Sequence, residues 1–214
     1  TVTTDVGVTV FCARWLLPQC VRPEFSMSND FTGAAFGGAD LTHANFPNTN
    51  FTKADFSGAN LEGATLTGSI FTEAILTGTR LVAAQAQAAT FDQAQLSGAV
   101  AANLAADQGQ FLQAIACGTD FTAASLVGAD FSQANLAGAK FCNARLQGAN
   151  FSGANLTGAD FSGAVLPQAN LSGATLQSTI FNGATLSQDV LAEAQAQGAS
   201  FAGAVLVDAN PPTS

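Results

Sequence analysis

Hydrophobic positions along most of this chain recur every five residues, a spacing that neither a helix nor an ordinary strand explains. When every fifth residue from Phe31 to Leu206 is taken as the centre of a pentapeptide, 31 of the 36 centres are Phe or Leu. The exceptions are Ala86, Ala101, Ala106, Ala116 and Ala196. Apolar positions repeat about every 3.6 residues in a helix and every two in a half-buried strand. The period of five therefore predicts a backbone that turns inward once in every pentapeptide.

The other positions of the pentapeptide are also regular, and they predict which side chains point inward. The residue three after each centre, which is also two before the next, is Ala in 28 of 36 cases. Asn or Asp commonly precedes the centre, Ser or Thr follows it, and 18 of the 21 Gly lie two residues after a centre. Large centres and small residues two before them would fill a square interior, with Gly at corners that need positive φ. Four pentapeptides would make one coil, and coils would stack as parallel strands about 4.8 Å apart.

Several pentapeptides match a known consensus. The stretches ADFSG (159–163), ANLTG (154–158) and ADLTH (39–43) resemble the pentapeptide-repeat family, whose consensus is A-(D/N)-L-X-X. The resemblance covers about 180 of the 214 residues. It implies an all-β fold, a right-handed quadrilateral parallel β-helix (a solenoid) of about nine coils. We expect residues 29–209 to form this β-helix, residues 1–28 a capping segment and residues 210–214 a C-terminal tail.

The two ends of the chain depart from the repeat. Members of the family often cap the first coil with a short helix, and TVFCARWLLPQ before the repeat favours a helix over 9–17 that Pro18 ends. Cys12 and Cys20 could form a disulfide in an oxidising compartment or stay as two free thiols. The C-terminus ANPPTS offers no obvious cap, so the last coil is open to end-to-end pairing with a second copy or a partner.

Residues 81–120 weaken the pattern. Four of the five Ala centres lie here, and Leu104 and Gly109 replace Ala at inward positions. We expect an under-filled and bulged middle, explained either by a partner-facing irregularity or by decay of the repeat. Near the other end, Asp189 falls on an inward position and is expected to swing out at a distorted corner, since an unpaired buried carboxylate is costly.

Composition and the scarcity of reactive side chains argue against catalysis. Fifteen acidic and six basic residues give a net charge of −9, which excludes a cationic surface for nucleic acid. The single histidine, His43, can complete neither a catalytic triad nor a zinc site. Cys117 and Cys142 lie 25 residues apart on adjacent faces, too distant to pair. No apolar run approaches the roughly 18 residues of a membrane span. We expect no catalytic residue, no cofactor and no metal.

Reading every twentieth residue gives the columns of side chains on each face of the rod. Some relatives are similar in fold and bind DNA gyrase by presenting an acidic rod that mimics DNA. That role needs stacked carboxylates, but one acidic column is interrupted by Arg80 and Lys140. It reads Asp40, Asn60, Arg80, Val100, Asp120, Lys140, Asp160. An acidic mimic of DNA that binds a topoisomerase is therefore the alternative function.

One face is nearly free of charge, and we call it the neutral face. Its centres are Phe36, Phe56, Leu76, Leu96, Ala116, Leu136, Leu156, Leu176 and Ala196, and its one charged residue is Asp55. The face centred on Phe31, the acidic face, carries seven charged residues. Uncharged surface is easier to desolvate. The neutral face is therefore the predicted protein-binding strip, with small polar surface of no function as the other interpretation. Its strip residues are Ile75, Gln95, Ile115, Asn135, Thr157 and Gln177.

Together these features predict a non-enzymatic rigid solenoid that serves as a protein-interaction or spacer element. A subunit of a larger assembly, docked on a membrane complex, would suit such a rod. The absence of an initial Met, the acidic balance and the Cys12/Cys20 pair favour a processed chain. Relatives occur in cyanobacteria and plastids, so the thylakoid lumen or another exported compartment is favoured over the cytoplasm.

Overall fold

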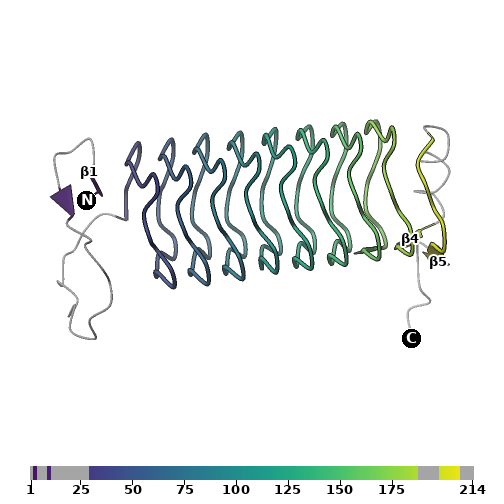
Figure 1. The fold of residues 1–214 in the computed structure, drawn as a ribbon, viewed down its shortest axis with the longest axis horizontal. Coiled ribbons are helices and arrows are strands. Elements are labelled where there is room, and N and C mark those ends of the chain that lie inside the picture. The colour runs from purple at the N-terminus through teal and green to yellow at the C-terminus, as the bar shows by residue number, and fades with distance from the viewer. Residues whose placement is uncertain (1, 4–8, 11–28, 188–197, 208–214) are drawn as a thin grey trace.

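Coils of similar size stack along one axis in the computed structural model, which describes residues 2–3, 9–10, 29–187 and 198–207 (Figure 1). Parallel bridges join residues twenty apart along the described repeat, from Asp30 with Asn50 to Ile180 with Ser200. Because a bridge recurs every twenty residues, four pentapeptides complete one coil. The fold is a four-sided parallel β-helix, as the period of five predicted.

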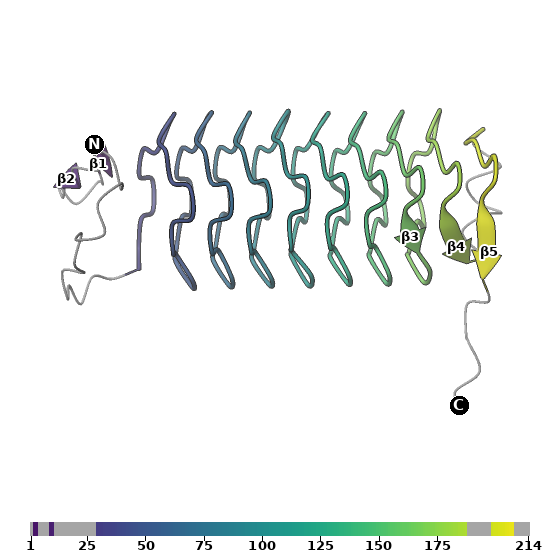
Figure 2. The same ribbon diagram turned by 60° about the horizontal axis from the view of Figure 1, so that its bottom comes forward.

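Most extended segments in the rod are single bridging residues, because turns leave little room for longer strands. Longer strands occur only towards the C-terminal end of the described repeat: β3 (Val165–Leu166), β4 (Thr185–Ser187) and β5 (Val205–Val207). They form a parallel sheet in the order β3-β4-β5, again in a register of twenty residues (Figure 2).

The first described residues form an antiparallel pair of short strands outside the repeat. Strand β1 (Val2–Thr3) pairs antiparallel with β2 (Thr9–Val10). Residues 9 and 10, the first two of the helix predicted over 9–17, are extended, as their β-branched side chains favour. Residues 11–17, Cys12 and Cys20 lie outside the described residues, as do Asp189 and the tail at 210–214.

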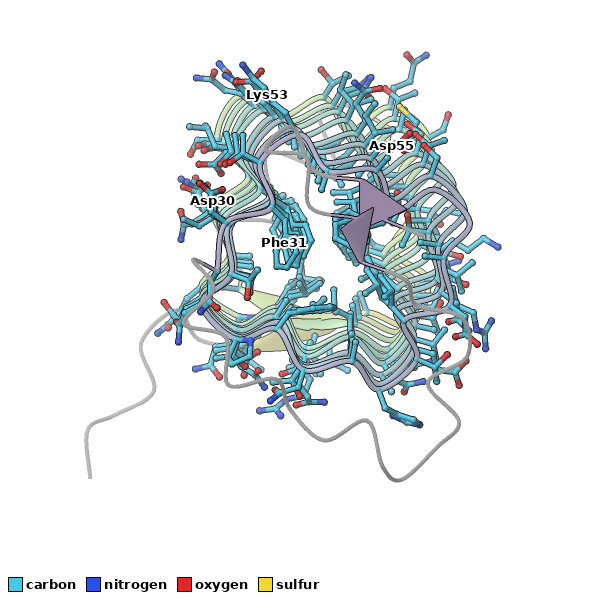
Figure 3. All side chains as sticks on the ribbon, turned by 90° about the vertical axis from the view of Figure 1, so that its left-hand side faces the viewer. Asp30, Phe31, Lys53 and Asp55 are labelled. Carbon is cyan, nitrogen blue, oxygen red and sulfur yellow. The ribbon has the colours of Figure 1, made fainter. Side chains whose placement is uncertain are left out.

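The core follows the predicted inward positions. From Phe51 to Phe181 every central Phe, Leu or Ala is buried, and so are the residues two before them. Phe rings from successive coils stack face to face, for example Phe111 on Phe131 with centroids 4.5 Å apart. Viewed along the rod axis, Phe31 and the rings behind it superimpose inside the square, while Asp30, Lys53 and Asp55 point outward (Figure 3). A second stack, on the opposite side, begins at Phe121.

The corners have left-handed backbone, which explains the placement of glycine. At each described position two residues after a centre, φ lies between 51° and 78°, at eighteen Gly and fifteen other residues. The next N–H closes the turn, as where Ala154 donates to the Phe151 carbonyl at 3.0 Å. This sign of φ at the third turn residue is that of a type II turn. The fifteen non-glycine residues show that stacking imposes the turn even where the side chain disfavours it.

The middle of the rod is not bulged, and that expectation was wrong. Bridges continue through it in register, including Arg80 with Val100 and Gln95 with Ile115. Leu104 points inward and is 1% exposed between two Ala centres, so it occupies space that those centres leave. At Gly109 an added Cβ would lie 2.9 Å from the Ala106 carbonyl oxygen, so the backbone itself approaches closely there. Exchanging large and small inward residues thus keeps the coil regular.

Candidate protein-binding surface

The structure brings the predicted strip together on one face. Ile75, Gln95, Ile115 and Asn135 form one continuous ladder of parallel bridges. Thr157 and Gln177 lie in the neighbouring column of the same face, on adjacent coils joined by a hydrogen bond from Gly158 N–H to the Gln177 carbonyl at 2.9 Å. Ile115 is 45% exposed, the most of any large hydrophobic side chain described on this face.

Charge is scarce on the neutral face also in three dimensions. Among its described residues only Asp55 is charged, while the opposite face carries Asp107 and Arg145. The Asp55 carboxylate accepts hydrogen bonds from the hydroxyl and N–H of Ser57. These two bonds lower the pKa of the Asp55 carboxyl below its usual value. The one charge of the face is therefore already engaged by its own turn.

Hydrogen-bond accounting explains the Asn or Asp that precedes each centre. In the pentapeptide centred on Phe151, the N–H groups of the centre and of the residue two after it donate to the next coil, at 2.7 and 2.9 Å. The third N–H after the centre closes the turn, and the fourth donates to the preceding coil at 2.9 Å. Only the Ser152 N–H lacks a backbone acceptor, and the Asn150 side chain accepts its hydrogen bond at 3.1 Å. We call this bond, from the N–H after a centre to the preceding Asn or Asp, the Asx cap.

Asx caps are frequent on both sides of the middle segment, residues 65–117, and absent within it. The capped N–H groups are those of Thr32, Thr42, Thr52, Ser57 and Glu62 on one side, and of Thr122, Ser132, Ala137, Ser152, Thr157, Ser162 and Ser172 on the other. In the middle segment no Asn or Asp precedes a centre. There, only the Leu112 N–H after a centre finds an acceptor among the described residues, Asp92 on the preceding coil at 3.0 Å.

On the neutral face, N–H groups without an acceptor in the described part of the chain, which we call open donors, lie beside the part of the strip that contains its two isoleucines. The N–H groups of Thr77, Ser97 and Cys117 have no acceptor among the described residues, and they follow Ile75, Gln95 and Ile115 by two residues. The face thus presents a column of backbone donors beside the exposed Ile115 and the half-buried Ile75. Sequence reasoning named the side chains but missed the donors. The signal was present, because Ile, Gln and Ile stand where the repeat prefers Asn or Asp.

The two edges of the neutral face differ. One, which we call the glycine edge, has Gly two after nearly every centre of the face. It comprises Gly38, Gly58, Gly78, Gly98, Gly118, Gly138, Gly158, Ser178 and Gly198. Added Cβ atoms at these glycines would meet nothing within 4 Å, so internal packing does not require them.

The other edge, towards the acidic face, carries long side chains, and we call it the glutamine edge. It comprises Gly33, Lys53, Glu73, Gln93, Gln113, Gln133, Gly153 and Gly173. Gln93 donates to Gln113 at 3.0 Å, and Gln113 donates to Gln133 at 2.9 Å. Lys53 and Glu73 form an exposed ion pair at 3.6 Å. The neutral face is therefore bordered by an edge of long polar side chains, among them Lys53, which points outward (Figure 3), and by an edge made almost entirely of glycine.

The remaining chemistry gives little support to other kinds of site. The column from Asp40 to Asp160 stacks as predicted, with Arg80 and Lys140 interrupting it. Arg80 is moreover paired with Glu62 at 2.7 Å, so this column offers no continuous row of carboxylates. No group of three His, Cys, Asp or Glu side chains among the described residues could hold a metal ion. Cys117 and Cys142 are free thiols, and burial raises the pKa of the Cys142 thiol.

Comparison with known proteins agrees with the fold. The family model for pentapeptide repeats matches residues 30–68, 69–100, 118–153 and 154–188, in eight copies. The chain therefore belongs to the pentapeptide repeat family, whose members are generally structural or binding proteins. No curated protein gives a significant match to the sequence. No helix among the described residues is long and apolar enough to cross a membrane.

Solved structures with similar folds include regulatory and resistance proteins. HetL from the cyanobacterium Nostoc sp. strain PCC 7120, a pentapeptide repeat protein involved in heterocyst differentiation regulation, is 34% identical with a TM-score of 0.54. The match covers 84% of this chain and 81% of HetL. Trypsin-treated QnrB1, a plasmid-mediated fluoroquinolone resistance protein, is 18% identical, with coverages of 81% and 89% and a TM-score of 0.54. A thylakoid-lumen protein from Arabidopsis thaliana is 22% identical, with coverages of 59% and 81% and a TM-score of only 0.29.

Proposed function

We propose that this protein is a non-enzymatic rigid solenoid that binds a protein partner through its neutral face and acts as an interaction or spacer element. The carrying observation is the coincidence, on one nearly uncharged face, of exposed Ile115 with the N–H groups of Thr77, Ser97 and Cys117, which have no acceptor among the described residues. An apolar side chain gains by being covered, and an open donor gains by meeting an acceptor. Low charge keeps the desolvation penalty of such a contact small.

The rest of the rod fits the role of a scaffold. Each coil is bonded to its two neighbours through backbone ladders, so the surface residues keep fixed spacings along the axis. Such a rod can present a face without reorganising it on binding, which limits the entropic cost of association. HetL, 34% identical to this chain, is involved in regulating differentiation, and a regulatory role is consistent with binding rather than catalysis.

Binding is tested in native extract of the source organism, separated by size, with the protein followed by mass spectrometry. We expect the wild-type protein to migrate above the position of a free chain of 21.5 kDa. Ile115→Glu and Thr157→Glu place a charge on the neutral face and should shift it towards the free chain. Ile70→Glu is the matched control, because Ile70 is 41% exposed but lies on the acidic face. If the two neutral-face variants co-migrate with their partners as well as Ile70→Glu does, the proposal fails.

End-to-end pairing through the C-terminal coil, predicted from the sequence, remains part of the proposal. Phe201 stacks on Phe181 but is only partly buried, and Leu206 at the centre of the last described pentapeptide is 45% exposed. An exposed apolar end favours addition of another surface. Leu206→Glu separates this contact from the neutral face, because it should reduce end-to-end pairing and leave face binding intact.

A further inference from the structure

We propose that the neutral face binds a second copy of this chain, packed antiparallel about a two-fold axis at the level of Ile115. This inference rests on the proposed function, because it names the partner of the same face. In this arrangement a residue that lies a given number of coils before the axis faces the residue of the second copy that lies the same number of coils after the axis. Both copies use the same surface, which is the commonest form of protein dimer.

Low charge makes the neutral face one along which two copies can meet. Each chain carries a net charge of −9, so two rods repel one another where their acidic residues face each other. The neutral face carries only Asp55 among its described residues. The antiparallel arrangement places Asp55 opposite Thr175 of the second copy, six coils from the other Asp55. A parallel arrangement would put both Asp55 residues at the same level of the rods, on opposite sides of the contact. Like charges held close together are unfavourable, which favours the antiparallel pairing.

The glutamine edge is complementary to itself in this register. The long side chains Lys53 and Glu73 lie opposite Gly173 and Gly153 of the second copy, where no side chain obstructs them. Gln93 lies opposite Gln133, and Gln113 meets its own copy. The carboxamide ladder that joins these three within one chain could then continue across the contact, since each amide both donates and accepts.

The face between the edges matches as well. Ile115 lies on the axis and meets Ile115 of the second copy, which covers an exposed apolar side chain on both rods. Gln95 lies opposite Asn135, so amide faces amide. Because both rods have the same spacing of about 4.8 Å between coils, this pairing repeats along the face without drifting out of register.

The area available points to a weak, reversible dimer. From Ala35 to Thr175 the face spans roughly 34 Å, and about three residues give it a width of about 10 Å. With the edge side chains, two copies would bury on the order of 1,000 Å², near the low end for specific interfaces. We therefore expect association at micromolar concentration rather than an obligate dimer.

Cross-linking through Cys117 tests the arrangement in the full-length chain. Cys117 lies on the neutral face two residues after Ile115, and the axis brings it opposite its own copy. In a variant with Cys12→Ser, Cys20→Ser and Cys142→Ser, a short bismaleimide should link two chains through Cys117. Adding Ile115→Glu should reduce the linked fraction at least tenfold, while adding Ile70→Glu should leave it unchanged.

A second cysteine position tests the direction of the two rods. In the same background with Cys117→Ser, Ser57→Cys places the thiol in the same column of the same face. The antiparallel axis puts its copy six coils away, roughly 29 Å, so no cross-link should form. Efficient linking at both positions would show a parallel pair and overturn the proposal. Sedimentation then compares the Ile115→Glu and Ile70→Glu variants of the wild-type chain, with melting curves to confirm that both are folded.

The outcomes separate this inference from the proposed function. A dimer of twice 21.5 kDa that weakens with Ile115→Glu alone supports the inference. A chain that stays monomeric at 100-fold above the expected concentration, or a dimer sensitive only to Leu206→Glu, overturns it. If in either case Ile115→Glu still releases the protein from a complex in native extract, the neutral face binds a different protein and the proposed function stands.

Discussion

The middle segment, residues 65–117, and the coils on either side have the same backbone conformation but differ in their central residues and in their Asx caps. In both regions the bridges keep a register of twenty and the corners keep positive φ. The flanking coils follow the consensus, with Phe or Leu centres and Asx caps. The middle replaces four centres by Ala and has no Asx cap. The ladder hydrogen bonds common to both regions are therefore sufficient to define the coil.

The difference lies in what each region leaves for other molecules. In the flanking coils most N–H groups after a centre are bonded within their own pentapeptide, as for Ser162 with Asp160 at 2.8 Å. In the middle segment the corresponding N–H groups, except that of Leu112, have no acceptor among the described residues, and Ile75 and Ile115 stand where the capping residues would be. The flanking coils thus satisfy most of these N–H groups internally, whereas the middle of the neutral face leaves donors with which a partner can form hydrogen bonds.

The largest expected effect tests whether the middle is packed as tightly as the flanks. Leu104→Ala should destabilise the protein by about 2–4 kcal/mol, because Leu104 is 1% exposed and fills the space between two Ala centres. Leu156→Ala in a flanking coil is the control and should cost a similar amount. Urea unfolding measured by circular dichroism compares the two. A loss below about 1 kcal/mol for Leu104→Ala alone would show an under-filled middle.

A pair of glycines separates close packing from turn strain. Gly109→Ala would place a Cβ 2.9 Å from the Ala106 carbonyl oxygen and 3.0 Å from the Phe111 ring, and should cost about 1–3 kcal/mol. Gly98→Ala meets nothing within 4 Å and has only the left-handed backbone to oppose it, at about 1 kcal/mol. Thermal melts should therefore place Gly109→Ala below Gly98→Ala. The reverse order would contradict the close approach at Gly109.

The Asx cap is tested by removing it in one region and adding it in the other. Asn155→Ala should cost about 1 kcal/mol, because Asn155 accepts from both the N–H and the hydroxyl of Thr157. Gln95→Ala should be nearly neutral, since Gln95 caps nothing. Gln95→Asn should stabilise by about 0.5 kcal/mol by capping the Ser97 N–H. Equal losses for the two Ala variants in chemical denaturation would mean that the cap contributes nothing.

The smallest effect is a pH dependence of opposite sign at two carboxyls. Hydrogen bonds from Ser57 lower the pKa of Asp55, so its contribution to stability is present above pH 3.8 and is lost as pH falls through the folded pKa. Burial raises the pKa of Asp92, so its charged form opposes folding at neutral pH. An Asn side chain can still accept the hydrogen bonds that Asp55 and Asp92 accept, but it carries no charge. Melting temperatures should show that Asp55→Asn reduces the loss on acidification from pH 5 to 2, whereas Asp92→Asn slightly stabilises at pH 7.

Much of the fold could be predicted from the sequence because its period of five has one consistent solution in three dimensions. Each residue type indicates its position in the coil: Phe and Leu the centres, Ala the other inward positions and Gly the corners. The structure has these residues in those positions. The regular middle could not be predicted from single residues, since Leu104 compensates for neighbours on either side. The strand at Thr9–Val10 was missed because apolar spacing in a short segment fits more than one structure. The open donors required an account of every backbone N–H, which side-chain patterns do not give.

Residue-resolved amide hydrogen exchange, in dilute protein and again in the assembled state, tests the role of the neutral face most directly. We expect the amides of Thr77, Ser97 and Cys117 to exchange fast in dilute protein and to become protected on assembly. The amides of Val82 and Ala102, equally open but on another face, should exchange fast in both states. If assembly protects all five alike, or protects only Val82 and Ala102, the neutral face is not the binding surface.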